Sequence, residues 1–404
     1  MPTTRNGDLE NRRSLMLNKF LDLITSLRLT IVCLAAGMAL IFAGTLAQVH
    51  LGIHEAQQRY FQSLFVWWPA EGRGIRFPIF PGGHLIGAVL LINLIAAHAK
   101  RFRWAWRKLG IHLTHAGLII MLAGGLFTDL FAVESHMRLA NGETKNYSED
   151  TRHDELAVID TTNPDFDQVT VIPESVLRRN QIIRHPSLPF QIVVRNFFQN
   201  SRLQVISDGN TNAQPLANQG PGAQVMVQPM PRATAPDDQN VVTAAIEIVP
   251  IDHAGRVQES LGTWLVSDEL GAPQRFSWMG KTWQLMMRAT RYYKPYSVTL
   301  QKFTHEKYAG TEIPKNFASQ IALIDPERSL NRDVLIYMNH PLRYRGETYY
   351  QAGFQKDDSA TILQVVHNPS FLAPYVACVI VAAGLLVQFG YHLVGFARRR
   401  RAFA

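Results

Sequence analysis

Three histidines stand close together in the stretch INLIAAHAKRFRWAWRKLGIHLTHAGLII, which spans residues 92–120. His98 lies near the end of one apolar run, and His112 and His115 lie at the start of the next. A neutral imidazole can supply one axial bond to haem iron, and an ionisable side chain inside a membrane span is a functional hypothesis by default. The alternative is an interfacial ring that lies in lipid with its nitrogens among the headgroups. Both interpretations stay open for His98 and His115, whereas the interfacial one is favoured for His112.

Helix geometry limits what these rings can do together. His112 and His115 are three residues apart, so they point the same way and cannot clamp opposite faces of one flat macrocycle. His98 and His115 would lie at similar depth on antiparallel neighbouring helices, where either can face a shared cavity. The Lys and Arg residues between the two runs suit haem propionates through charge-assisted hydrogen bonds. Asp129 is expected to be solvated, because it lies near the far end of its apolar run.

Four apolar segments must position these side chains. A membrane-crossing helix takes about 20 mostly apolar residues. Three segments reach that length, and the segment from His84 to His98 reaches it when it is extended back to Ile79. The sequence therefore predicts four transmembrane helices, at residues 26–48, 79–99, 112–133 and 371–396.

Lys and Arg near the ends of the spans indicate their orientation. Basic clusters precede the first span, fill the link at 100–111 and follow the fourth span. The tails at 1–25 and 397–404 and the link are therefore expected on the cytoplasmic side, with 49–78 and 134–370 outside. The net charge of +8 is then an orientation and anionic-lipid signal. Nucleic acid is not expected as a partner, because no nucleic-acid-binding motif accompanies the basic residues.

The two outer segments differ in pattern. Residues 134–370 contain many alternating or β-branched runs, such as FQIVVRNF and ATILQVVH, separated by Gly, Pro, Asn and Asp. This pattern predicts a large, mostly antiparallel β domain inserted between the third and fourth helices, as a sandwich or an open barrel. Residues 49–78 contain aromatic residues at mixed helical spacing, which predicts an amphipathic segment at the membrane interface.

Several kinds of chemistry are excluded by what the sequence lacks. It contains no HExxH, GxSxG, GxxxxGK or GxGxxG motif. Its two cysteines, Cys33 and Cys378, both fall in predicted spans. They lie far apart in the sequence, so the chain has neither a CxxC motif for thiol exchange nor a CxxCH motif for covalent haem attachment. The sequence is therefore not that of a thioredoxin-like reductant or of a c-type cytochrome.

Two stretches before the fourth span carry a family resemblance. FTHEKYAGTEIPKNFAS at 303–319 is followed by YMNHPLRYRGETYYQAGF at 337–354 and then by the last span. With the order of three spans, a large domain and one span, these stretches resemble the ResB family of cytochrome c biogenesis membrane proteins (System II). Ala47, near the end of the first span, departs from the proline expected there. The matching positions are Phe303, Tyr308, Gly310, Pro314, Phe317, Ser319, Asn339, Pro341, Gly346, Tyr350 and Gln351.

The resemblance implies partners and a transient cofactor. ResB-like proteins work in the bacterial cytoplasmic membrane with a ResC/CcsA-type membrane protein, whose tryptophan-rich haem-binding segment is absent here. Together they are thought to move haem b to the outer face and attach it to apocytochrome c, which requires thiol-reducing partner proteins. The chain would then be non-catalytic alone but part of a cytochrome c haem lyase complex.

The resemblance also implies particular residues. A haem-ligand histidine is expected on the second span, where His98 matches, and His115 is the second candidate. Asn339, Pro341, Gly346, Tyr350 and Gln351 are candidates for a surface that holds apocytochrome or the partner. Their stretch is also typical of a turn between strands.

Two other functions remain compatible with the sequence. One is a membrane-anchored β domain that docks an extracytoplasmic partner without meeting haem. The other is a b-type electron-transfer protein, although that would require two well-placed axial ligands for each haem, and few histidine pairs are available.

Overall fold

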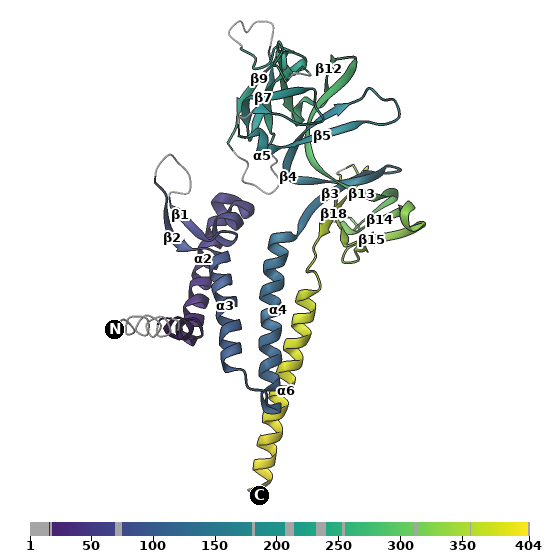
Figure 1. Ribbon diagram of the computed structural model, residues 1–404. Helices are drawn as coiled ribbons and strands as arrows, with labels where there is room; N and C mark the ends of the chain where they lie inside the picture. Colours follow the sequence, from purple (N-terminus) through teal and green to yellow (C-terminus); the bar gives the residue numbers. More distant parts are fainter. Residues whose placement is uncertain are drawn as a thin grey trace, which may run out of the picture. The chain divides into compact units, whose positions relative to one another are not determined.

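The computed structural model describes residues 16, 18–68, 75–179, 182–206, 214–231, 240–252, 255–310, 314–355 and 357–402. The described chain divides into two compact units. A helical unit contains the chain before Val133 and after His367, and a β unit contains most of the chain between them. The prediction of four membrane helices, with a large antiparallel β domain between the third and the fourth, is confirmed (Figure 1).

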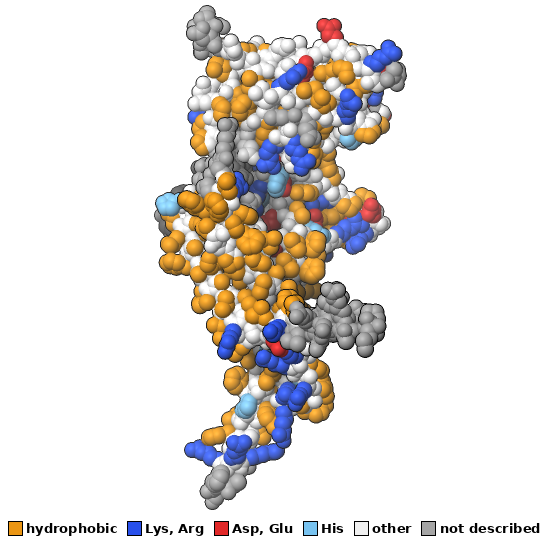
Figure 2. Space-filling model, turned by 60° about the vertical axis from the view of Figure 1, so that its left-hand side comes forward, with side chains coloured by type: hydrophobic (Ala, Val, Ile, Leu, Met, Phe, Trp, Pro, Cys, Tyr) orange, Lys and Arg blue, Asp and Glu red, His pale blue; other side chains and the backbone are white. Residues whose placement is uncertain are grey.

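Among its described residues, the helical unit contains four helices that are long and apolar enough to cross a membrane, by length and composition. Hydrophobic side chains cover its middle, and Lys and Arg side chains gather toward the C-terminal end of the chain (Figure 2). The helices are α2 (Leu27–Ala56, with a break at Gly52), α3 (Gly83–Arg101), α4 (Leu109–Phe131) and α6 (Ala373–Ala402).

A buried amide joins α3 to the beginning of α2. Asn93 is only 2% exposed, and its Nδ2 donates to the carbonyl oxygens of Ile24 at 2.5 Å and Ser26 at 3.2 Å. Its Oδ1 accepts from Thr30 Oγ1 at 2.6 Å. Polar side chains that bond across helices act as glue in an apolar environment, since an unpaired amide there is costly.

Glycines bring α4 and α6 into close contact. Gly110, Gly117 and Gly124 repeat every seven residues, and all three are buried. A Cβ at Gly117 would lie 2.6 Å from Val381 Cγ2 and 2.9 Å from the Ala377 carbonyl oxygen. Small residues at helix interfaces let the backbones approach in this way, so the seven-residue repeat specifies the pairing of α4 with α6.

The described residues between α2 and α3 form a short helical turn and two strands. Gln57–Phe61 form a short π-helical turn, η1. The strands β1 (Phe65–Trp68) and β2 (Phe77–Pro81) then pair as an antiparallel hairpin, with Trp67, Trp68 and Phe77 exposed. Proline cannot continue a helix, which explains why α3 begins only after Pro81.

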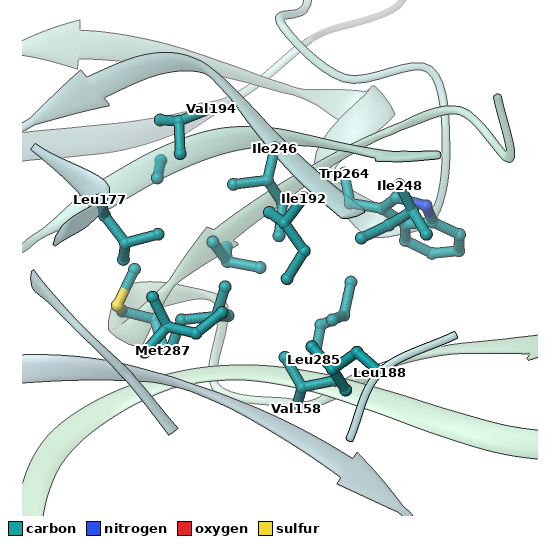
Figure 3. Packing of buried hydrophobic residues seen from close by; sticks show 14 of the residues in the cluster. Val158, Leu177, Leu188, Ile192, Val194, Ile246, Ile248, Trp264, Leu285 and Met287 are labelled. Atoms are coloured by element: carbon teal, nitrogen blue, oxygen red, sulfur yellow. The ribbon is translucent and has the colours of Figure 1, made fainter. Parts of the chain in front are cut away.

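The first lobe of the β unit is a sandwich. Its four-stranded sheet has the order β11-β10-β7-β6 and packs on β5, β12 and parts of two long strands, β4 and β13. Leu285 and Met287 of β13 face Ile192 and Ile246 across the core (Figure 3). Each fully buried side chain of this kind contributes about 2 kcal/mol. The strands are β4 (Thr144–Asp160), β5 (Gln168–Pro173), β6 (Ile182–Ile183), β7 (Phe190–Phe198), β10 (Thr243–Pro250), β11 (Thr263–Ser267), β12 (Gln274–Trp278) and β13 (Lys281–Lys307).

The second lobe uses the other parts of β4 and β13. Its sheet has the order β15-β14-β13-β4-β3-β18-β17-β16. A tight turn, in which Tyr337 and His340 bond to each other, connects β15 to β16, the two strands at the ends of this order. The remaining strands are β3 (Val133–Ala140), β14 (Pro314–Asp325), β15 (Leu330–Tyr337), β16 (Leu342–Tyr344), β17 (Glu347–Phe354) and β18 (Ala360–His367), with a separate pair β8 (Ser201–Val205) and β9 (Val225–Pro229).

A charged network lies in the second lobe. The Lys294 side chain is 3% exposed, and its Nζ donates to Glu347 Oε1 at 2.6 Å. Tyr296 and Tyr349 donate to the other carboxylate oxygen at 2.5 and 2.9 Å. Burial raises the pKa of Glu347, but hydrogen bonds from Lys294 and Tyr296 outweigh burial and hold that pKa below its ordinary value.

A second carboxylate in the β unit, Asp154, has a raised pKa, and we expect protein stability to depend on pH because of it. Burial, with the neighbouring charges of Glu174 and Asp268, raises the pKa of Asp154 to about 7. The unfolded chain therefore loses this proton first, and stability falls as pH rises from about 4 toward 7. Asp154→Asn is expected to raise the free energy of unfolding by about 2 kcal/mol at pH 8, after discounting for partial exposure, and to have little effect at pH 4.

Urea unfolding of the full chain in detergent, followed by amide exchange of β4, measures this effect. The exposed Asp165→Asn serves as the control and should give the same stability as the wild type at both pH values. Equal effects of Asp154→Asn at pH 4 and pH 8 would contradict the assignment.

Candidate functional site

Three imidazoles meet where α3 ends and α4 begins. His98 comes from the last turns of α3, and His112 and His115 come from the first turns of α4. The His98 ring stacks on His115, with ring centroids 5.3 Å apart and planes 25° apart. It also meets His112 edge-on at 5.1 Å. The structure thus brings together His98 and His115, and adds His112, for which the sequence favoured an interfacial position.

Backbone carbonyls determine which nitrogen is free on two of these rings. His115 Nδ1 lies 2.8 Å from the Ile111 carbonyl oxygen, which can only accept, so Nδ1 carries the proton and Nε2 the lone pair. By the same argument, His112 Nε2 donates to the Arg103 carbonyl oxygen at 3.1 Å. His112 Nδ1 is buried and has no hydrogen-bond partner among the described residues. The His98 ring forms no hydrogen bond with any residue that the structure describes.

The rings are better suited to single axial bonds than to chelation. Lone pairs lie in the plane of an imidazole, so the nearly parallel rings of His98 and His115 cannot converge on an ion between them. In the described part of the chain, no group of three or more His, Cys, Asp or Glu residues could hold a metal ion. A haem needs only one protein ligand on a given face, and the free nitrogens of His98 and His115 fit that requirement.

Five basic residues lie between His98 and His112 in the sequence, and they differ in their contacts. Lys100 Nζ pairs with Asp22 at 2.5 Å, and Arg101 donates to the Thr25 carbonyl oxygen at 3.3 Å. The side chains of Arg103, Arg107 and Lys108 are exposed and form no ion pair within the described ranges. These three residues, rather than Lys100 or Arg101, are therefore available for an anionic ligand.

A second polar contact joins the other ends of α3 and α4. His84, in the first turn of α3, bonds to Asp129 near the end of α4, and Gln62 Nε2 donates to Asp129 Oδ1 at 2.7 Å. The side chains of His84 and Asp129 are 30% and 27% exposed. Asp129 is exposed, as expected, but its contacts with His84 and Gln62 were not predicted. His84 is as far from His98 in the sequence as Asp129 is from His115. Because α3 and α4 are antiparallel, this equal spacing could have predicted the contact.

The other candidate residues lie in the second lobe of the β unit. Asn339 and Gly346 occupy turns and have positive φ angles of 61° and 82°. Pro341 follows the first turn, and Tyr350 is exposed on β17. Gln351 accepts from Ser319 Oγ at 2.6 Å and donates to Thr361 Oγ1 at 2.8 Å. The turn interpretation accounts for Asn339 and Gly346, and cross-strand bonding accounts for Gln351, so a partner surface here stays a prediction.

Comparison with known proteins bears on the second lobe. Residues 278–362 match the model of the ResB-like family, and this segment runs from the end of β12 into β18. Protein NrfI of Wolinella succinogenes is 30% identical over 92 residues, which cover 23% of this chain and 10% of NrfI. The chain thus spans only a small part of the length of this curated relative, and the histidine cluster lies outside the family match. These matches show that residues 278–362 of this chain are similar to the ResB-like family.

Proposed function

We propose that this chain is a membrane subunit of a cytochrome c maturation complex, which receives haem at the His98–His115 pair. The observation that carries the proposal is the pair itself. Two imidazoles with free nitrogens lie in candidate membrane helices of a ResB-like protein. Arg103 and Arg107, in the link between these helices, form no ion pair with the residues that the structure describes. Haem is cargo here, not a resident cofactor.

The residues of the chain would divide the work. His98 supplies the axial bond to iron, because its ring is free of hydrogen bonds. His115 stacks on it and serves as the alternate ligand, while Arg103, Arg107 and Lys108 pair with the propionates. The basic ends of the helices favour a cytoplasmic location for this cluster, with the β unit on the opposite side of the bacterial cytoplasmic membrane.

Haem attachment itself would require other proteins. A thioether forms when a cysteine S–H adds across a haem vinyl group, with no net oxidation. The only cysteines of this chain, Cys33 and Cys378, lie in α2 and α6. The thiols would therefore come from apocytochrome c, kept reduced by other proteins, and a ResC/CcsA-type partner would complete the synthase.

Haem content and cytochrome c formation test the proposal together. We expect full-length wild-type chain, purified with its membrane partner, to carry haem. His98→Ala should lower that content and the yield of c-type cytochrome by about tenfold or more, as expected when a metal site loses an interaction that holds it. His115→Ala should have a smaller effect.

His50→Ala is the matched control, because His50 is an exposed histidine on α2. Full haem and full cytochrome yield in His98→Ala would make His98 the wrong ligand. A wild-type complex that never carries haem would rule out haem delivery.

A further inference from the structure

The contact between His84 and Asp129 is partly exposed, and further contacts hold its two side chains in place. His84 Nε2 donates to one carboxylate oxygen of Asp129. Gln62, which follows η1, donates to the other. The backbone is held as well, because His84 N donates to the Ser63 carbonyl oxygen at 3.2 Å. Gly82 and Gly83 pack so tightly against residues 61–63 that a Cβ at either position would clash with backbone. His84 therefore has a fixed position and orientation.

Both histidine sites lie where α3 and α4 face each other. His84 and His98 are fourteen residues apart on α3, and His115 and Asp129 are fourteen residues apart on α4. Fourteen residues make nearly four helical turns, or about 21 Å. Antiparallel helices with equal spacings give two matched levels, His98 with His115 at one end and His84 with Asp129 at the other.

The chemistry of the second level favours a metal ligand. In the neutral ring, donation from Nε2 leaves the lone pair on Nδ1, which no described residue engages. A carboxylate that accepts from one imidazole nitrogen fixes the tautomer and the orientation of the ring. One imidazole and one carboxylate already bonded to it do not chelate a free ion, but a single imidazole suffices for the iron of a porphyrin.

The geometry points to a second haem site, separate from the one at His98. In it His84, oriented by Asp129 and Gln62, supplies the bond to iron. This site lies beside the start of α3, at the end of α4 that is nearest the β unit in sequence. This inference rests on the proposed function. Haem accepted at His98 would be passed to His84 before it leaves the chain. Asp129 is a positioning residue, because it acts through the imidazole.

The plain alternative is a structural clamp between α3 and α4, and one variant separates the two. His84→Gln keeps an amide donor near the position of Nε2, so it retains a clamp with Asp129 but offers iron no imidazole. His84→Ala loses both the clamp and the ligand, and it leaves a space that free imidazole can occupy.

The experiment replaces the wild-type chain by each variant in cells that mature c-type cytochromes. Haem bound to the purified full-length chain and partner is measured beside the yield of c-type cytochrome. We expect both His84 variants to retain haem, held at His98, while cytochrome yield falls about tenfold or more. Added imidazole should restore the yield of His84→Ala, and Asp129→Asn should lower the yield less than His84→Ala does.

Two results would overturn the inference in distinguishable ways. If His84→Gln gives the wild-type yield of c-type cytochrome, the contact only holds α3 and α4 together. The proposed function would then be unaffected. A haem-free wild-type complex would remove the proposed function and this inference with it. His50→Ala again serves as the control and should match the wild type in both measurements.

Discussion

Lys294→Met is expected to destabilise the β unit by about 3 kcal/mol at pH 7, since removing one partner of a buried ion pair leaves an uncompensated charge. Lys294 is the only Lys or Arg that hydrogen-bonds to the Glu347 carboxylate among the described residues. Tyr296 and Tyr349 would still donate to it, but they carry no charge to offset its burial. Urea unfolding followed by amide exchange of β17 measures the loss in the full chain.

The pH dependence of this loss identifies its cause. In the wild type, the lowered pKa of Glu347 means that its stabilising contribution is present above the ordinary carboxyl pKa and lost as pH falls through the folded value. In Lys294→Met the buried Glu347 charge has no positive partner and lowers the free energy of unfolding. Protonation of Glu347 at acid pH removes that charge and its cost. The difference between variant and wild type should therefore shrink at acid pH.

Two variants provide controls for this prediction. Lys281→Met removes the partner of Asp160, but the Lys281 side chain is 49% exposed, so the loss should be below about 1 kcal/mol. Lys294→Met combined with Glu347→Gln should recover part of the stability, because the charge is gone. A loss in Lys294→Met that is independent of pH would indicate lost packing instead.

The membrane helices were predictable because a long apolar run has few other stable forms. Their limits were not, since hydropathy does not distinguish a short apolar strand from the start of a helix. Residues 79–82 were predicted to begin the second span, yet Phe77–Pro81 form a strand of the β1–β2 hairpin. Pro78 and Pro81 carried that information, because both interrupt helices.

The candidate site was predictable only in part. The sequence placed His98 and His115 at similar depth, because helices joined by a short link run antiparallel. Asp129 is exposed as predicted, but its contact with His84 was missed because each span was considered alone, and His84 lies on another helix. Gln351 shows the corresponding limit in a sheet. Its bonds to Ser319 and Thr361 depend on the pairing of distant strands, which alternation along one strand does not determine.

The α4–α6 pair matters because the helical unit is interrupted by a long insertion. The chain leaves α4 for β3 and returns from β18 to α6, and β3 pairs with β18 in the β unit. In the helical unit, Thr128 and Asn368 exchange side-chain hydrogen bonds at 3.2–3.3 Å near the same two junctions. The helix pair must therefore form from segments separated by more than two hundred residues, and its own packing has to specify it.

Gly117→Leu is expected to destabilise this pair by about 3 kcal/mol, because overpacking a tight contact forces side chains and backbone apart. The first added carbon alone would lie 2.6 Å from Val381 Cγ2 and 2.9 Å from the Ala377 carbonyl oxygen. The second of these neighbours is backbone, so a change of rotamer cannot relieve it. Unfolding of the full chain in increasing SDS, followed by helical circular dichroism, measures the loss.

Gly125→Leu is the matched control, made on the same helix about two turns from its C-terminal end. A Cβ at Gly125 meets nothing within 4 Å, and the residue is exposed. Leucine is a better helix former than glycine by up to about 1 kcal/mol, so Gly125→Leu should leave stability unchanged or raise it. Equal losses at the two positions would mean that leucine disturbs α4 itself. A loss confined to Gly117→Leu would assign the effect to the α4–α6 contact, which then holds together the two segments that flank the β unit.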